Sequence, residues 1–151
     1  MKKIAFIYLV LLSHKVQGQN QVYTKAEQVS ITVYQKKIDK IKLPWGNLGK
    51  VVIVFSKNGS VERLRKDSIW GIKREVKNEF IRFYDQKTFK IVDTSLIIIY
   101  QTYSPNPIYY FSKDLISDIK LLDKKELIKV LGEEQFVEAY KKSNIIRKWA
   151  Y

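Results

Sequence analysis

A run of β-branched residues at 50–55 and a returning segment at 61–66 flank the dipeptide Asn58-Gly59. β-Branched side chains favour strands, and Asn-Gly supplies the two positive-φ positions of a two-residue type I′ turn. The pattern therefore predicts a β-hairpin whose turn is formed by Asn58 and Gly59. Among the local patterns in the chain, this is the one that most strongly indicates a particular structure.

Short apolar segments continue on both sides of this hairpin. Period-two alternation at Val29, Ile31 and Val33 indicates a strand before it, followed by a turn cluster at 44–49. After the hairpin, the segments that read as strands are 68–72, 79–85, 88–92, 96–100 and 108–112. Connections this short favour antiparallel pairing, because parallel strands need long crossovers.

The apolar pattern changes to helical spacing after Ser112. The residues with this spacing are Leu115, Ile116, Ile119 and Leu122. Asp123 and Glu126 then have the form of a capping box, and residues 133–142 read as a second helix beyond Gly132. The predicted fold is mainly β (α+β), either an antiparallel meander or a partly closed barrel, with C-terminal helices.

The N-terminus has the pattern of a cleavable secretory signal peptide. Lys2 and Lys3 precede an apolar run at 4–12, and Gly18 is a small residue suited to cleavage before Gln19. As a helix, the run spans roughly 14 Å, about half of a bilayer core. We therefore expect a secreted or periplasmic protein without a transmembrane segment after cleavage. The expected organisation is a signal peptide (1–18), one β-then-α domain (19–142) and a C-terminal tail (143–151).

The chain has no cysteine, and its only histidine, His14, lies inside the predicted signal peptide. Cysteine and histidine metal sites, histidine-based triads and cysteine nucleophiles are therefore excluded from the exported form. We predict no metal, no cofactor and no catalytic residue. In an oxidising compartment, the stability of the fold has to come from packing, because no disulfide can form.

Basic residues are concentrated in the first part of the predicted exported chain. Residues 19–66 hold ten basic and three acidic side chains, a net charge of +7, whereas the remainder has a net charge of +3. The candidate binding residues are Lys36, Lys37, Lys40, Lys42, Arg63, Arg65 and Lys66. Together they could form a face for phosphate-rich partners, or a solvated surface that keeps the protein soluble and protects edge strands.

Aromatic residues offer a second candidate set. Trp45 lies between Pro44 and Gly46, and Trp70 precedes Gly71. At the edges of loops, indole rings either plug the end of a barrel or line a binding site, and both readings stay open. The aromatic cluster around the 101–108 loop either stacks on a ligand or belongs to the core.

Carboxylate chemistry has weak support in the sequence. Asp67, Asp85, Asp93, Asp114 and Asp118 lie at predicted strand or helix ends, where aspartate is common as a cap or turn former. Ser117 and Lys120 match the pattern Ser-x-x-Lys, but its companion motifs are absent. A carboxylate-based hydrolase is therefore the least favoured function.

Two motifs carry a resemblance to a group of proteins. Ser68-Ile69-Trp70-Gly71 is followed by a Tyr-Tyr-Phe-Ser-Lys-Asp-Leu segment at 109–115 and by the helix start Leu-Asp-Lys-Lys-Glu-Leu. In these motifs the chain resembles small exported proteins of the Bacteroidetes type. The resemblance carries no catalytic motif, so it implies export and fold, and no activity.

These observations favour an exported, non-catalytic binding protein or envelope accessory protein. The alternative is an anion-binding module whose lysine-rich face contacts lipopolysaccharide, an anionic polymer or a membrane surface. Specific recognition of nucleic acid is not expected. Lysine is more frequent here than arginine, and arginine is the residue that forms the bidentate hydrogen bonds used in specific recognition.

Overall fold

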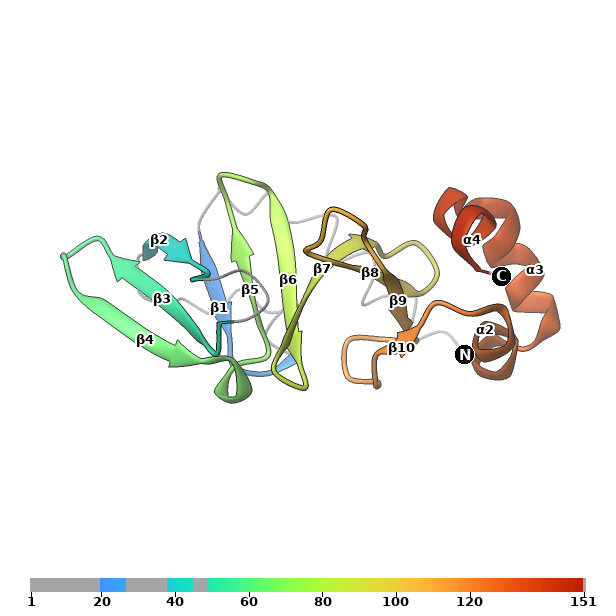
Figure 1. Cartoon of the computed structure of the whole chain (residues 1–151), viewed down its shortest axis with the longest axis horizontal. Coiled ribbons are helices and arrows are strands. Elements are labelled where there is room, and N and C mark those ends of the chain that lie inside the picture. The colour runs from blue at the N-terminus through green and yellow to red at the C-terminus, as the bar shows by residue number, and fades with distance from the viewer. Residues whose placement is uncertain (1–19, 27–37, 45–48, 151) are drawn as a thin grey trace, which may run out of the picture. The chain divides into compact units, whose positions relative to one another are not determined.

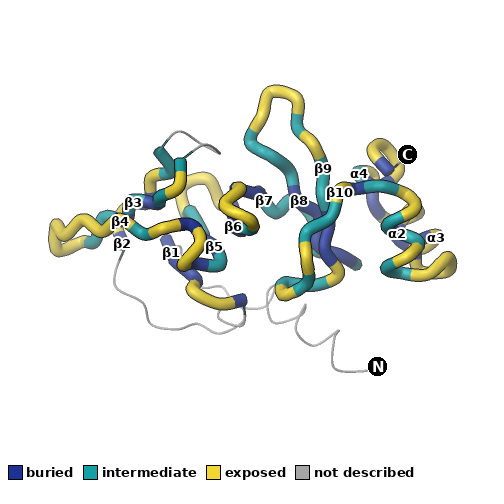
Figure 2. Tube along the Cα trace, turned by 60° about the horizontal axis from the view of Figure 1, so that its bottom comes forward, coloured by how far each residue is buried: buried dark blue, intermediate teal, exposed yellow. Residues whose placement is uncertain are grey.

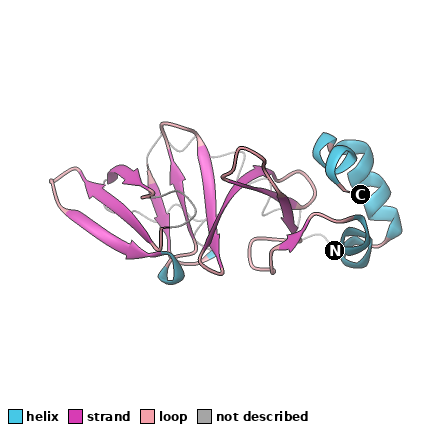
Figure 3. Cartoon of the chain, in the orientation of Figure 1, coloured by secondary structure: helices cyan, strands magenta, loops and turns pink. Residues whose placement is uncertain are grey.

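The computed structural model describes residues 20–26, 38–44 and 49–150, and these form two compact units, 1–91 and 92–151. The single domain predicted over 19–142 stays a prediction. The strands form antiparallel sheets that are not closed into a barrel, and three helices follow them (Figures 1 and 3). The mainly β fold with C-terminal helices is confirmed, and of the two expected architectures the open meander is the one observed.

The first unit contains two groups of antiparallel strands. One has the order β1-β5-β6-β7 and the other the order β2-β3-β4. The strands of the first group are β1 (Gln21–Tyr23), β5 (Gly71–Arg74), β6 (Glu79–Tyr84) and β7 (Lys87–Asp93), whose last two residues belong to the second unit. The second group is made of β2 (Ile38–Lys42), β3 (Val51–Ser56) and β4 (Val61–Arg65), and a 3₁₀ turn, η2 (Lys66–Ser68), follows it.

The predicted hairpin is confirmed as β3 and β4, but its turn differs from the prediction. The Gly59 amide donates to the Ser56 carbonyl at 2.9 Å, and the Ser56 amide donates to Ser60 at 2.9 Å. Gly59 has a φ of +85°, whereas Asn58 does not have a positive φ. The loop is therefore a three-residue connection that ends in a left-handed glycine. The Asn58 side chain accepts hydrogen bonds from the Ser60 amide and hydroxyl, which holds this turn without a second positive φ.

A tight turn with two positive-φ residues occurs instead between β6 and β7. Tyr84 pairs with Lys87, and Asp85 and Gln86 between them have φ values of +48° and +59°. This is the two-residue geometry that we expected at Asn58-Gly59. The sequence predicted a turn at Gln86-Lys87, between the strands 79–85 and 88–92, but it did not indicate this type of turn, because neither Asp85 nor Gln86 is glycine.

The second unit packs a small antiparallel sheet with helices. Its strands are β8 (Ile98–Thr102), β9 (Tyr109–Ser112) and β10 (Lys120–Leu121), and its helices are α2 (Lys124–Leu131), α3 (Glu133–Lys142) and α4 (Asn144–Trp149). Asp123 caps α2 by accepting from two backbone amides, and the helix ends at Gly132, whose φ is +80°. One apolar core joins strands and helices, whose buried segments are dark blue in Figure 2. It comprises Ile97, Ile99, Phe111, Leu122, Leu127, Phe136, Ala139, Ile146 and Ala150.

Two expectations for this unit are corrected. The helical spacing that begins at Leu115 does not produce a helix before Asp123. Asp114 accepts from the Ile116 and Ser117 amides and so forms a turn, and β10 then pairs with β9. The predicted tail at 143–151 contains helix α4, whose Ile146 is only 1% exposed.

Several expectations lie outside the described residues. These are the signal peptide at 1–18, the alternating strand at Val29, Ile31 and Val33, and the central part of the turn cluster that contains Trp45. Within the described part of the chain, no helix is long and apolar enough to cross a membrane.

Candidate functional site

The site begins with an irregularity in strand β2. Ile38 and Ile41 are both buried although three positions separate them, which simple alternation does not allow. The pairing shifts between Ile38 and Lys40, so that Asp39 is an extra residue in β2. This bulge lets both isoleucines face the inside and directs Lys40 and Lys42 outward.

The register of the two neighbouring pairings places four cationic side chains on one face of the three-stranded sheet. Lys42 lies opposite Ile53, which in turn lies opposite Arg63. Lys40 is two residues from Lys42 in β2, and Arg65 is two residues from Arg63 in β4, so both share this face. All four cationic residues are exposed, whereas Val52 and Val54 on the other side of β3 are buried. We call the outward side, with Lys40, Lys42, Arg63 and Arg65, the basic face.

The charges of the basic face are only partly compensated. Arg65 donates to Asp67 from Nε at 3.0 Å, and this hydrogen bond holds the pKa of Asp67 below its usual value. In the described part of the chain, no ion pair joins Lys40, Lys42 or Arg63 to an acid. The only acidic residue of β4 is Glu62, which points to the opposite side of the sheet. A net positive field therefore remains over this face.

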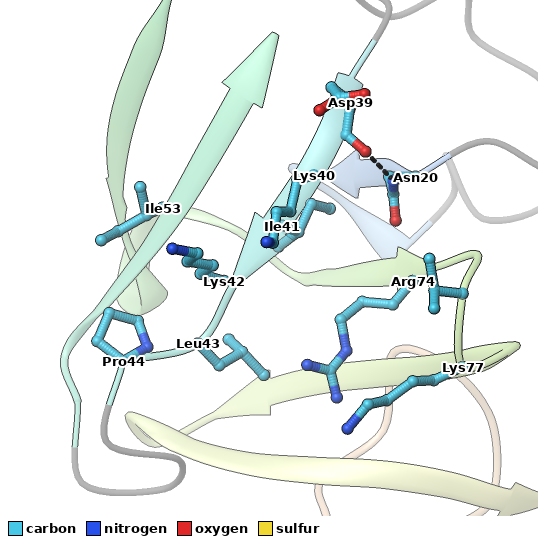
Figure 4. Close-up of a pocket in the computed structure, with 11 residues that line it drawn as sticks. Asn20, Asp39, Lys40, Ile41, Lys42, Leu43, Pro44, Ile53, Arg74 and Lys77 are labelled. Carbon is cyan, nitrogen blue, oxygen red and sulfur yellow. Dashed lines mark hydrogen bonds between the residues drawn. The ribbon is translucent and has the colours of Figure 1, made fainter.

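A pocket of about 500 Å³ adjoins β2 in the same unit (Figure 4). Lys40 and Lys42 line it from β2, while Arg74 and Lys77 approach from β5 and the loop that follows it. Asn20 fixes this arrangement, because its side chain donates to the Asp39 carbonyl at 2.8 Å and accepts from the Glu75 amide at 3.1 Å. The residues that line the pocket therefore include four cationic side chains and one carboxylate.

Arg74 contributes less charge to this pocket than its position suggests. Its Nε donates to Glu79 Oε2 at 2.8 Å, and Glu79 is buried and also lies 3.8 Å from Lys90. The pair neutralises much of the guanidinium charge. Lys40, Lys42 and Lys77 are the more available cations for an anionic group.

Lys66 is not part of the basic face, contrary to our expectation. It is 2% exposed, and its ammonium donates to the Thr88 hydroxyl at 2.7 Å and lies 5.6 Å from the centroid of the Phe83 ring. Burial lowers the pKa of Lys66. It follows β4 in the turn η2, where strand alternation no longer determines its direction, and it packs inside the first unit.

Trp70 belongs to an aromatic cluster and does not line the basic face. Its ring packs edge-on against Tyr23 with a centroid distance of 6.3 Å, and the Arg82 guanidinium lies 5.6 Å from its centroid. Burial raises the pKa of Tyr23 to about 12. These contacts favour the structural reading of Trp70. The other predicted binding residues, Lys36, Lys37 and Trp45, lie outside the described residues.

Of the candidate carboxylates, Asp67, Asp93 and Asp114 have structural partners, and so has Ser117. Burial alone would raise the pKa of Asp114, but hydrogen bonds from Ser117 and Ile116 outweigh it and hold this pKa below its usual value. The Ser117 hydroxyl donates to Asp114, and Lys120 pairs with Glu126 at 3.0 Å. Ser117 and Lys120 therefore do not form the pair that the Ser-x-x-Lys pattern requires.

Sequence reasoning missed two sets of residues at this site. Arg74, Lys77 and Asn20 reach the pocket from distant positions, and no local pattern connects them with β2. Ile53 and Phe55 were interpreted only as strand residues, although the period-two rule places them on the same side as Lys40 and Lys42 once the bulge is known.

Comparison of the chain with protein-family models, with curated proteins and with solved structures finds no match. Among the residues that the structure describes, no group of three acidic or histidine side chains is arranged to hold a metal ion.

Proposed function

We propose that this protein is an exported binding protein that holds an anionic partner on its basic face. The observation that carries the proposal is the strand register, which brings Lys40, Lys42 and Arg63 to one side of β2-β3-β4. Export is proposed from the signal-peptide pattern of residues 1–18. The adjoining pocket would accept one anionic group of the partner beside Lys40, Lys42 and Lys77.

The arrangement favours a polymer or a surface with repeated charges over a single small anion. The cations of the basic face are exposed, and its lysines carry point charges without the paired geometry of arginine. Binding of this kind depends on the summed field and on the release of counterions, so it weakens steeply as salt rises.

Heparin chromatography tests this proposal with a charge-reversal variant, Lys40→Glu, Lys42→Glu and Arg63→Glu. Arg65 is left unchanged, because its loss would also free Asp67. We expect the parent to be retained and the variant to elute at much lower salt, since each phosphate or sulfate contact contributes close to one unit to the log–log salt dependence in nucleic-acid systems.

The matched control reverses three exposed lysines of the second unit, Lys124→Glu, Lys125→Glu and Lys141→Glu. It changes the net charge by the same amount, so it separates the position of the charges from their number. Equal elution of the two variants would refute binding by the basic face. If the parent is not retained at all, the lysines serve as solvated surface and the proposal falls.

A further inference from the structure

The basic face carries an apolar stripe between its two rows of cations. Val51, Ile53 and Phe55 of the central strand β3 alternate with buried Val52 and Val54, so they project to the same side as the cations. They are only half-buried, and Val61, opposite Phe55 on β4, is 58% exposed. The face is therefore amphipathic across its width.

The flanking cations can cover or uncover this stripe. The Lys42 ammonium lies 5.2 Å from the centroid of the Phe55 ring, so its aliphatic stem runs along the apolar surface. Long basic side chains can keep their stems on apolar groups while their charged ends move towards a polar partner. The stripe and the charges can thus be used together by one partner.

We propose that the partner held by the basic face is an anionic lipid surface. This inference rests on the proposed function and names its ligand class. Lys40, Lys42 and Arg63 would contact headgroup phosphates, while Ile53, Phe55 and Val61 would lie at the boundary with the acyl chains. A basic residue near an anionic leaflet strengthens partitioning by roughly fivefold, and burial of apolar area adds to it.

A soluble polyanion would use only half of this surface. Sulfated or phosphorylated polymers offer charge but little aliphatic area, so they give no role to an exposed valine and a half-exposed isoleucine in the middle of a cationic face. Charge complementarity and the apolar stripe together favour a lipid surface, and a soluble polyanion is the outcome that would overturn the inference.

The experiment measures sedimentation of the full chain with vesicles of phosphatidylcholine alone and of phosphatidylcholine with an equal amount of phosphatidylglycerol. The test variant is Ile53→Thr with Val61→Thr, which retains β-branched side chains and removes apolar surface. The control is Ile116→Thr with Val137→Thr, which makes the same two changes at exposed positions of the second unit. Parent and variants carry the same N-terminal residues, so differences between them report on the substituted positions.

We expect the parent to prefer the anionic vesicles and the Ile53/Val61 variant to bind them roughly tenfold more weakly, with unchanged retention on heparin. The control should bind as the parent does. Equal vesicle binding by parent and test variant, with heparin retention that still needs Lys40, Lys42 and Arg63, would identify a soluble polyanion. That result would overturn the lipid inference and leave the proposed function intact. A parent that is not retained on heparin would refute the proposed function and, with it, this inference.

Discussion

Replacing Gly71 with alanine would place a methyl group against the neighbouring strand. Gly71 lies in β5 between two neighbouring strands, where it pairs with Tyr23 of β1 on one side and with Arg82 of β6 on the other. A Cβ at this position would lie 2.3 Å from the Ile81 carbonyl oxygen and 3.3 Å from the Arg82 Cα. Both neighbours are backbone atoms, so no side-chain rotation can relieve the contact.

The size of the effect follows from the movement that the methyl group requires. An ordinary contact needs about 3.5 Å, so β5 and β6 would have to separate by roughly 1 Å at this row. Hydrogen bonds between the two strands would then lengthen beyond their favourable range, and buried Ile72 and Ile81 beside them would lose packing. Overpacking and weakened ladder bonds together cost about 3 kcal/mol, which lowers the melting temperature by roughly 10 °C.

Thermal melts followed by circular dichroism, with urea titrations beside them, measure this loss. Gly59→Ala is the matched control, because Gly59 has a φ of +85° but nothing lies within 4 Å of an added Cβ. That substitution costs only backbone strain, about 1 kcal/mol. Hydrogen exchange at the Phe83 amide, which donates to the Trp70 carbonyl at 2.8 Å, locates the damage in Gly71→Ala. If Gly71→Ala costs no more than Gly59→Ala, the close approach of β5 and β6 is refuted.

Two further predictions concern the ends of the chain. Protein recovered from the cell envelope should begin at or near Gln19 by intact mass spectrometry, and a mature form that retains Met1 would contradict export through a cleaved signal peptide. Ile146→Ala should lower the free energy of unfolding by about 3 kcal/mol in urea, because Ile146 is 1% exposed in the core of the second unit. A loss below about 0.5 kcal/mol would mean that α4 is not packed there.

Elements with a local signal were predictable from the sequence. The β3–β4 hairpin followed from the β-branched run before Asn58-Gly59 and the segment that returns after it, and α2 followed from Asp123 at its start and Gly132 at its end. The type of turn in this hairpin was not predictable, because the Asn58 side chain stabilises the longer connection by hydrogen bonds from Ser60. The spacing that begins at Leu115 suited a helix equally well, but the hydrogen bonds of Asp114 hold a turn, and β10 pairs with an existing strand edge.

The basic face shows where sequence reasoning about charge reaches its limit. An excess of lysine and arginine over residues 19–66 indicates a positive region, but it does not show which side chains share a surface. That depends on the alternation of side chains between the two sides of a strand. In β2 this alternation is interrupted at the Asp39 bulge, and the sequence has no glycine or other local signal for the bulge. The same reasoning therefore grouped Arg63 correctly and Lys66 wrongly, because Lys66 lies beyond the end of β4 and turns into the interior. Once the bulge is known, the alternation of side chains also assigns Ile53 to the basic face, and this combination of charge with apolar surface is the basis of the proposed contact with lipid.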